Sequence, residues 1–438
     1  MSNTKEFEPT DWKSPEMQAR IRRRYRRDRR FKVMGVMAVS LAALFLFLLI
    51  GKIARDGAMG FLQTSLDIDV TFSESVLGDP RTMSPDEFEA KVRQANMIRL
   101  LDDALRGHFP EVQSRSDRRA LIRMVSGGAR EQLRTMVLET PAIVGSTRTV
   151  RLLAGDDIDQ LRKGKIDANE AEGNRKVKDK ELGWYQKLDE EGRVSLNFHT
   201  RFFTSGDSRD PELAGIWGAT VGSALTLVVT LLIAFPIGVL TAIYLEEFAP
   251  QNRLTDIIEI NINNLAAVPS IVFGLLGLAV FLGVMHLPRS APVVGGLTLA
   301  LMTLPTIIIA ARASIKAVPP SIRDAARGLG ASPMQVVFHH VVPLAMPGIL
   351  TGTIIGMAQA LGETAPLLMI GMVAFIVDIP GGFTDAATAL PVQIFLWADS
   401  PERAFVEKTS AAILVLLTFL IAMNGLAIWL RQKFERQW

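Results

Sequence analysis

The chain has 438 residues, no cysteine and a hydrophobic fraction of 49%. Its 48 basic and 45 acidic side chains leave a net charge of only +3, so no bulk field favours nucleic acid, and we expect no nucleic-acid partner. The lack of cysteine excludes disulfides, thiolate nucleophiles and cysteine-ligated metal sites. Because the apolar residues gather in long runs, the composition favours a membrane protein.

The N-terminal 32 residues end in a strongly basic segment, with nine Lys and Arg between Arg20 and Lys32. The apolar run 33–50 follows, close to the roughly 20 residues that a helix needs to cross a bilayer. We predict a basic cytoplasmic tail (1–32) and a first transmembrane helix (33–50), since Lys and Arg beside a span stay in the cytoplasm. The alternative is a cleaved signal peptide, whose apolar core is shorter, about 7 to 15 residues.

Residues 51–216 carry charges throughout and no run long enough to span a bilayer. We predict an inserted α+β domain on the periplasmic side of the membrane. Segments 66–72 and 194–198 alternate apolar and polar side chains, as half-buried strands do. The acidic turn 189–192 is expected to be a hairpin connection into the second of these strands.

Helices are also expected in this domain. Ser84 is followed by Pro and, three residues on, by Glu, which predicts a capped helix over 85–107. A second helical pattern covers 117–138 and is interrupted by a pair of glycines. His108 and His199 have no metal-binding spacing, so we predict solvated surface residues and no metal site.

Five further apolar runs predict an all-α membrane domain over 217–438, which makes six transmembrane helices in all. Six crossings return the C-terminus to the cytoplasm, where basic residues follow the last run. The basic loop 312–343 is then cytoplasmic too. The five runs are 217–244, 265–285, 294–311, 347–377 and 409–430.

The segment 321–333 of this loop is short, amphipathic and unable to cross the bilayer. Two prolines precede it, Ala325 and Ala326 allow another surface to approach closely, and Gly330 permits a sharp turn. This spacing fits a segment that docks a partner. By itself it fits an ordinary interfacial helix between two spans equally well.

The same loop resembles the EAA loop of ABC-importer permeases, whose pattern is Glu-Ala-Ala, three residues, Gly, nine residues, then Ile-x-Leu-Pro. Asp stands for the Glu, His340 for the Ile and Val342 for the Leu. The resemblance implies a type I importer core in which the loop forms a coupling helix that docks in a cleft of an ATPase subunit. The residues in register are Asp324, Ala325, Ala326, Gly330 and Pro343.

Two segments carry a second resemblance, to the A-type permease family of the Pst phosphate importers. They are 268–275, with Pro-Ser-Ile-Val-Phe-Gly, and 362–368, with Gly-Glu-Thr-Ala-Pro-Leu-Leu. The inserted domain resembles the N-terminal extension of one bacterial branch of that family. The resemblance implies the permease subunit of an ATP-driven importer of inorganic phosphate in the bacterial inner membrane.

Glu363 lies inside a predicted span, where a carboxylate is costly unless it is paired, protonated or facing water. We expect it to pair with a cation and to hold or gate the pathway; the alternative is a helix-packing role. Many members of the family carry Arg at the positions of Gln359 and Ile309. The preceding proline leaves backbone groups without helix partners, so Ser270 could line a cavity with them. Alternatively, the proline only kinks the helix and the Ser270 side chain bonds to its own backbone. The pathway candidates are Glu363, Gln359, Thr364, Ser270 and Arg312.

No Gly-x-x-x-x-Gly-Lys-Ser/Thr loop occurs in the sequence, so we expect no catalysis and no cofactor on this chain. ATP and Mg would be bound by a separate ATPase. The expected partners are a second homologous permease, two ATPase subunits, a periplasmic phosphate-binding protein and membrane lipid. Two other functions stay open: a permease for another oxyanion, such as phosphonate, sulfate or molybdate, and a membrane receptor or scaffold with an exported sensing domain.

Overall fold

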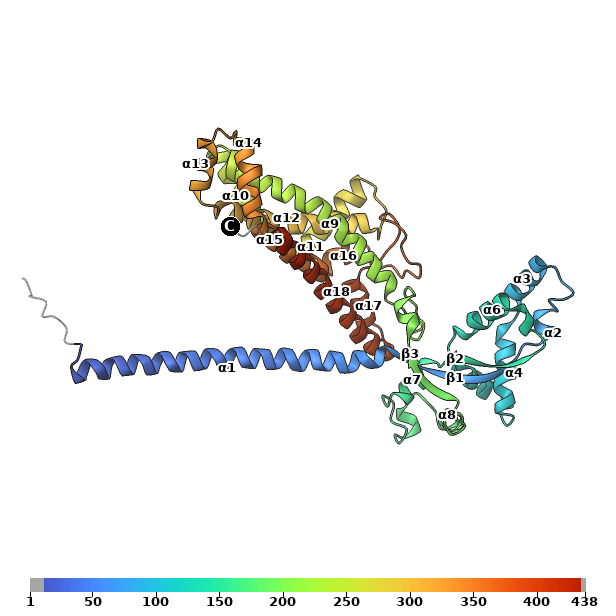
Figure 1. The fold of residues 1–438 in the computed structure, drawn as a ribbon. Helices are drawn as coiled ribbons and strands as arrows, with labels where there is room; N and C mark the ends of the chain where they lie inside the picture. Colours follow the sequence, from blue (N-terminus) through green and yellow to red (C-terminus); the bar gives the residue numbers. More distant parts are fainter. Residues whose placement is uncertain (1–11, 435–438) are drawn as a thin grey trace, which may run out of the picture. The chain divides into compact units, whose positions relative to one another are not determined.

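The computed structural model describes residues 12–434, and these are mostly helical with one small sheet (Figure 1). Five of the described helices are long and apolar enough to cross a membrane, or six if one bent pair counts as a span. The chain divides into two compact units, residues 1–55 and 56–438.

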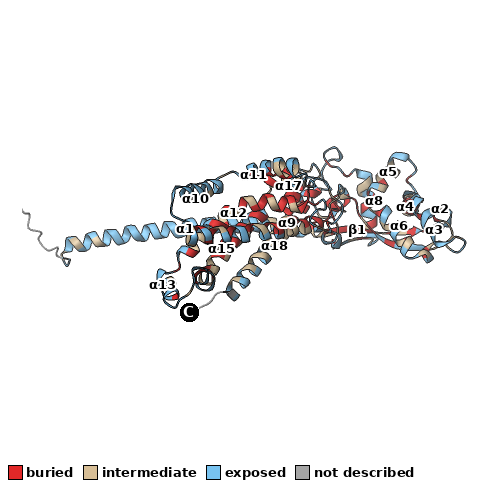
Figure 2. Ribbon diagram, turned by 90° about the horizontal axis from the view of Figure 1, so that it is seen from above, coloured by how far each residue is buried: buried red, intermediate tan, exposed pale blue. Residues whose placement is uncertain are grey.

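Helix α1 (Pro15–Gly60) contains nearly all of the first unit that the structure describes. The basic segment and the apolar run 33–50 form one uninterrupted helix, while residues 1–11 of the predicted tail lie outside the described residues. Every side chain of the apolar run is exposed (Figure 2). Such a surface suits lipid rather than water.

Three antiparallel strands form the sheet of the inserted domain: β1 (Leu62–Thr71), β2 (Thr147–Leu153) and β3 (Val194–Phe198). Their order is β2-β1-β3, so the first strand lies in the middle. The two predicted strands are confirmed as β1 and β3. Strand β2 was not predicted, because only two of its side chains, Val150 and Leu152, are buried.

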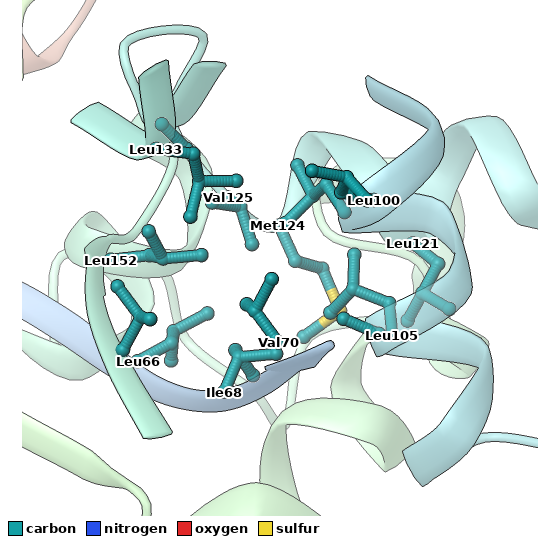
Figure 3. Packing of buried hydrophobic residues seen from close by; sticks show 14 of the residues in the cluster. Leu66, Ile68, Val70, Leu100, Leu105, Leu121, Met124, Val125, Leu133 and Leu152 are labelled. Atoms are coloured by element: carbon teal, nitrogen blue, oxygen red, sulfur yellow. The ribbon is translucent and has the colours of Figure 1, made fainter. Parts of the chain in front are cut away.

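One face of β1 supplies the centre of the domain core (Figure 3). Alternate side chains point into it because the side-chain period of a strand is two. On the other face, Asp67 pairs with Arg151 and Asp69 pairs with Arg193. Burying each large apolar side chain contributes roughly 1.5 to 3 kcal/mol. The inward residues of β1 are Leu66, Ile68 and Val70, each 0% exposed.

Helices cover the inner face of the sheet. The capped start at Ser84 is confirmed, with the reciprocal bonds to Glu87. The helix predicted over 85–107 is two helices, because Ala95 takes an extended backbone conformation between them. The break predicted in the following helical region is confirmed. The helices are α2 (Glu74–Leu77), α3 (Pro85–Gln94), α4 (Met97–His108), α5 (Arg115–Arg123), α6 (Ala129–Glu139), α7 (Asp156–Arg162) and α8 (Asp179–Glu190).

The expected hairpin at 189–192 is wrong. Residues 189 and 190 finish α8, and the chain then turns at Gly192, where φ is +69°, and enters β3. His199 is also placed differently from the expectation: it is 3% exposed, not a solvated surface residue. Acidic residues in a turn therefore indicated the change of direction but not the element before it.

The membrane domain contains four long helices of the second unit and one bent pair. Helices α9 (Trp217–Ile243, continued by a π-helical turn, Tyr244–Phe248) and α12 (Pro292–Lys316) approach each other closely. A Cβ on Gly296 would lie 2.4 Å from the Cβ of Val229, so only glycine fits there. The other long helices are α15 (Val342–Gly362), with the turns before it, and α18 (Ala404–Phe434).

Two predicted spans are interrupted. The span 265–285 falls on α10 (Arg253–Ala266) and α11 (Ser270–Gly277), which with the π-helical turn Leu278–Val284 form a pair bent by 101°. The proline before Ser270 lacks an amide hydrogen and breaks the helix there.

The predicted span 347–377 is wrong in its second half. Helix α15 ends at Gly362, and only the short helix α16 (Ala365–Met369) follows before α17 (Leu390–Ala398). Pro366 has no amide hydrogen to donate to the carbonyl of Gly362 four residues earlier, so α15 does not continue through Glu363 and Thr364. Glu363 therefore lies at a helix end rather than in the middle of a span.

Candidate coupling and translocation sites

Helix α13 (Pro320–Gly328) is the centre of the predicted docking loop. Its end is a Schellman motif, in which the amide of Ala331 donates to the carbonyl of Ala326 (3.1 Å) and that of Gly330 to Arg327 (2.9 Å). Gly330 has φ of +84°, which confirms the predicted sharp turn. The loop leaves the helix with its last carbonyls satisfied.

The two alanines of the loop have different surroundings. Ala326 is 5% exposed and packs in the core of the membrane domain, whereas Asp324 and Ala325 are exposed. Successive helix positions point about 100° apart, so only one alanine of the pair can face outward. The expectation that Ala326 meets another surface is therefore wrong. Leu329, which the sequence pattern did not indicate, is 90% exposed and presents an apolar side chain beside Ala325.

Arg323 fastens α13 to the spans. Its guanidinium contacts Glu247 (2.6 Å) at the end of α9, and it donates to the carbonyls of Val318 (2.6 Å) and Ile315 (3.0 Å) at the end of α12. The two charged side chains are 16% and 8% exposed. Planar guanidinium geometry suits this set of acceptors. The loop is thus tied to two membrane helices by one side chain.

Arg312, a pathway candidate, is held by two acids. Its Nε lies 2.7 Å from Glu246, and its Nη2 contacts Glu259 of α10. Both carboxylates compensate its charge. The structure therefore places Arg312 in a network that joins α9, α10 and α12, beside the Arg323 anchor rather than beside the other pathway candidates.

Pro343 lies in the first turn of α15, directly after the π-helical turn Val336–Val341. The short helix α14 (Pro333–Gln335) begins this segment with a capping box at Ser332. His339 and His340 are exposed, and no metal-binding group occurs among the described residues, 12–434. Both histidines are therefore surface side chains.

The two segments that resemble Pst permeases are brought together. A Cβ on Gly274 of α11 would lie 2.7 Å from the Cα of Pro366, so the backbones of α11 and α16 touch. Ser270 begins α11 and Thr364 precedes α16. More than 90 residues of sequence separate these helix breaks, yet they form one structural unit. Irregular backbone at such breaks can line a pathway.

Glu363 ends α15 and is half-buried, while Gln359, one turn earlier, is exposed. Within residues 12–434, no ion pair reaches the Glu363 carboxylate. Ser270 and Thr364 are half-buried. Helix α10, which precedes this region, has no buried residue (Figure 2). The face that carries Gln359 and Glu363 is thus open within this single chain.

The sequence comparisons give the class of this protein. The chain belongs to the family described as binding-protein-dependent transport system inner membrane components, whose profile matches residues 214–436. It is a multi-pass protein of the inner membrane and a subunit of an ABC transporter assembly. A second profile, described as a domain of unknown function, matches residues 18–172.

Within that class the chain is an ABC-importer permease of the PstA type. It is 30% identical over 217 residues to the phosphate transport system permease protein PstA 1 of Mycobacterium tuberculosis, covering 50% of this chain and 70% of that protein. It is 31% identical over 228 residues to PstA of Pasteurella multocida, covering 51% and 78%. An inward-facing structure of the MetNI methionine ABC transporter is 17% identical, with a TM-score of 0.39, and covers 51% of this chain and 95% of that chain.

Proposed function

We propose that this chain is the permease subunit of an ATP-driven importer of inorganic phosphate. The observation that carries the proposal is the contact of Gly274 with Pro366, which joins the two segments that resemble phosphate permeases at adjacent helix breaks. The PstA relatives, which are named as phosphate transport permeases, support the same substrate. The chain itself catalyses nothing and binds no cofactor, and ATP with Mg belongs to the ATPase subunits.

The coupling loop is the proposed contact with the ATPase. Asp324, Ala325 and Leu329 are among its exposed residues, and Gly330 and Pro343 shape the turn and the return into α15. When the two ATPase subunits close, α13 moves with them. The Arg323 anchor transmits this motion to α9 and α12, whose packed helices move as rigid bodies.

The proposed pathway uses Ser270, Gln359, Glu363 and Thr364. Phosphate is an anion, and Arg312 is already paired with two carboxylates. The second homologous permease, seated against the open face, therefore supplies the cation that pairs with Glu363. Another oxyanion is the second candidate substrate, because Gln359 and Ile309 stand where many phosphate permeases carry Arg.

Substrate and energy source can be tested together on the assembled complex in proteoliposomes. Uptake of radiolabelled phosphate should require ATP and the binding protein, and excess unlabelled phosphate should suppress it. ATP-dependent uptake of labelled sulfate, molybdate or a phosphonate, without uptake of phosphate, would replace the proposed cargo with that oxyanion. If no ATPase co-purifies with the chain, the receptor or scaffold function is favoured instead.

The proposed orientation places both termini in the cytoplasm and the domain 51–216 in the periplasm. The domain then binds neither ATP nor the ATPase. The support for this orientation is the basic segment before the first span. Since the chain has no native cysteine, single-cysteine variants test it directly. A membrane-impermeant maleimide should label Asp86→Cys in intact spheroplasts and Leu329→Cys only after lysis. The reverse result would invert the topology.

A further inference from the structure

The sheet of the inserted domain changes polarity at one end. At the start of β1, polar side chains are buried: Gln63, Thr64 and Ser65 are 2%, 0% and 3% exposed. On the paired strand β3, apolar side chains are exposed instead, Leu196 by 40% and Phe198 by 59%. A strand of a water-soluble domain normally shows the opposite pattern.

Aromatic rings extend this exposed apolar surface. Phe198 stacks on Phe203 with ring centroids 5.8 Å apart, and Phe203 stacks on Phe61 at 5.5 Å. Phe203 is 36% exposed, whereas its neighbour Phe202 is fully buried and packs against Trp397 of the membrane domain. We call Leu196, Phe198 and Phe203 the aromatic patch.

The aromatic patch lies where the membrane helices end. Phe61 directly follows α1, whose last residue, Gly60, is so close to the first turns of α18 that a Cβ there would be 2.7 Å from the carbonyl oxygen of Glu407. The segment around Phe203 is bonded to the start of α9, since Ser205 accepts from the amide of Trp217 (3.2 Å). Trp217 is itself 44% exposed.

We propose that the aromatic patch inserts into the boundary between lipid headgroups and acyl chains, so that the inserted domain rests on the membrane. Exposed aromatic residues are enriched at this depth, and the exposed Trp217 at the start of α9 is bonded to the segment that carries Phe203. The exposed side chain of Arg201 lies beside the patch in sequence and suits anionic headgroups. Lipid contact also explains why apolar side chains face outward on β3 while polar ones are buried on β1.

Spin labels at single cysteines measure this contact in the assembled complex, reconstituted in phosphatidylethanolamine and phosphatidylglycerol vesicles. The test positions are Leu196→Cys and Phe198→Cys. The controls are Asp86→Cys, exposed on α3, and Leu232→Cys, 67% exposed in the middle of α9. Collision with oxygen reports lipid, and collision with a water-soluble nickel chelate reports water.

The ratio of oxygen to nickel collisions at both test positions should be severalfold higher than at Asp86→Cys and should approach the ratio at Leu232→Cys. A ratio equal to that of Asp86→Cys would place the patch in water. Low collision rates with both reagents would place it under a protein partner. Either result overturns the proposal. Each labelled variant must still assemble with its partner subunits, and the two adjacent test positions guard against a local folding defect in one of them.

Discussion

Lys163 of the inserted domain and Glu407 of α18 form an ion pair of 3.1 Å that is almost sealed from solvent, with side chains 1% and 5% exposed. The same ammonium lies 2.7 Å from Asp159, whose other oxygen accepts from the amide of Thr64. A buried cation that serves two carboxylates fixes the geometry of all three groups, because none can turn to water. The inserted domain is thereby fastened to the first turn of the last span.

Lys163→Met should destabilise the protein by roughly 3 to 5 kcal/mol, since it leaves the buried Asp159 without its cation and Glu407 with only a longer pair to Lys165 (3.8 Å). Adding Glu407→Gln should recover part of the loss. The control Arg162→Met removes a neighbouring cation that is 37% exposed and should cost less than about 1 kcal/mol. Thermal unfolding in detergent, with limited proteolysis of the inserted domain, measures the stability of each variant. Equal stability of Lys163→Met and the parent would show that the pair is not stabilising.

Arg323→Lys should uncouple transport from ATP hydrolysis. Lysine cannot reach Glu247 and two carbonyls at once, and each charge-assisted bond contributes about 1.5 to 3 kcal/mol, so uptake should fall at least about tenfold. ATPase binding should survive because Arg323 is mostly covered. Arg327→Lys, on the same helix and 61% exposed, is the control and should keep normal uptake. Comparable uptake by both variants would remove the proposed role of the anchor.

Gly330→Ala should weaken the coupling loop by about 1 to 2 kcal/mol, because alanine resists the left-handed conformation at φ of +84°. Gly328→Ala is the matched control: it lies in α13, and alanine is favoured there by about 1 kcal/mol. A Cβ would meet no atom within 4 Å at either position, so the difference isolates the backbone. ATP-dependent phosphate uptake and the protease sensitivity of the loop measure how far each substitution disturbs it. An undisturbed loop in Gly330→Ala would mean that the turn adapts.

Glu363→Gln should abolish phosphate uptake without lowering membrane abundance. If the carboxylate pairs with a cation of the second permease, the neutral amide leaves that cation buried and unpaired, which is strongly unfavourable. A purely structural glutamate would behave differently, because glutamine avoids the cost of an intramembrane carboxylate and should insert at least as well. Glu402→Gln, another half-buried glutamate, is the control and should transport normally. Full uptake by Glu363→Gln would show that Glu363 has only a packing role.

His199 should make the protein less stable in acid. Its Nδ1 lies 2.6 Å from the Nζ of Lys408, and burial, followed by the charges of Lys408 and Lys163, lowers the pKa of His199 to about 3. The unfolded chain binds this proton near pH 6.5, so stability falls as pH falls between about 6.5 and 3, by up to roughly 1.4 kcal/mol per pH unit. His199→Gln should flatten that loss in thermal unfolding followed from pH 7.5 to 4.5.

Asp156 changes the stability with pH in the opposite direction, so its effect must be measured separately from that of His199. Burial, followed by the charge of Asp157, raises the pKa of Asp156 to about 7, well above the value near 3.9 in an unfolded chain. The folded protein then takes up the proton first, and stability rises as pH falls from about 7 to 4. Asp156→Asn should therefore lose more stability in acid than the parent does. If both variants shift in the same direction, one of the two assignments is wrong.

Local pattern was enough to predict the elements whose signal lies within one segment. Apolar runs indicated the membrane helices, alternation indicated β1 and β3, and the cap at Ser84 was confirmed. The turn at Gly330 also followed from sequence, because a left-handed residue is a local requirement. Hydrophobic length could not show where α15 ends, since residues 365–377 are apolar again although a break at Glu363 and Thr364 precedes them.

The tertiary structure alone decided which charged groups meet. Arg323 and Glu247 are 76 residues apart, and Lys163 and Glu407 are 244 residues apart, so no periodicity connects them. It also decided that Ala326 faces inward while Ala325 and Leu329 face out. The physical reason is common to these cases: backbone preferences act over a few residues, whereas the burial of a side chain depends on which distant element packs against it.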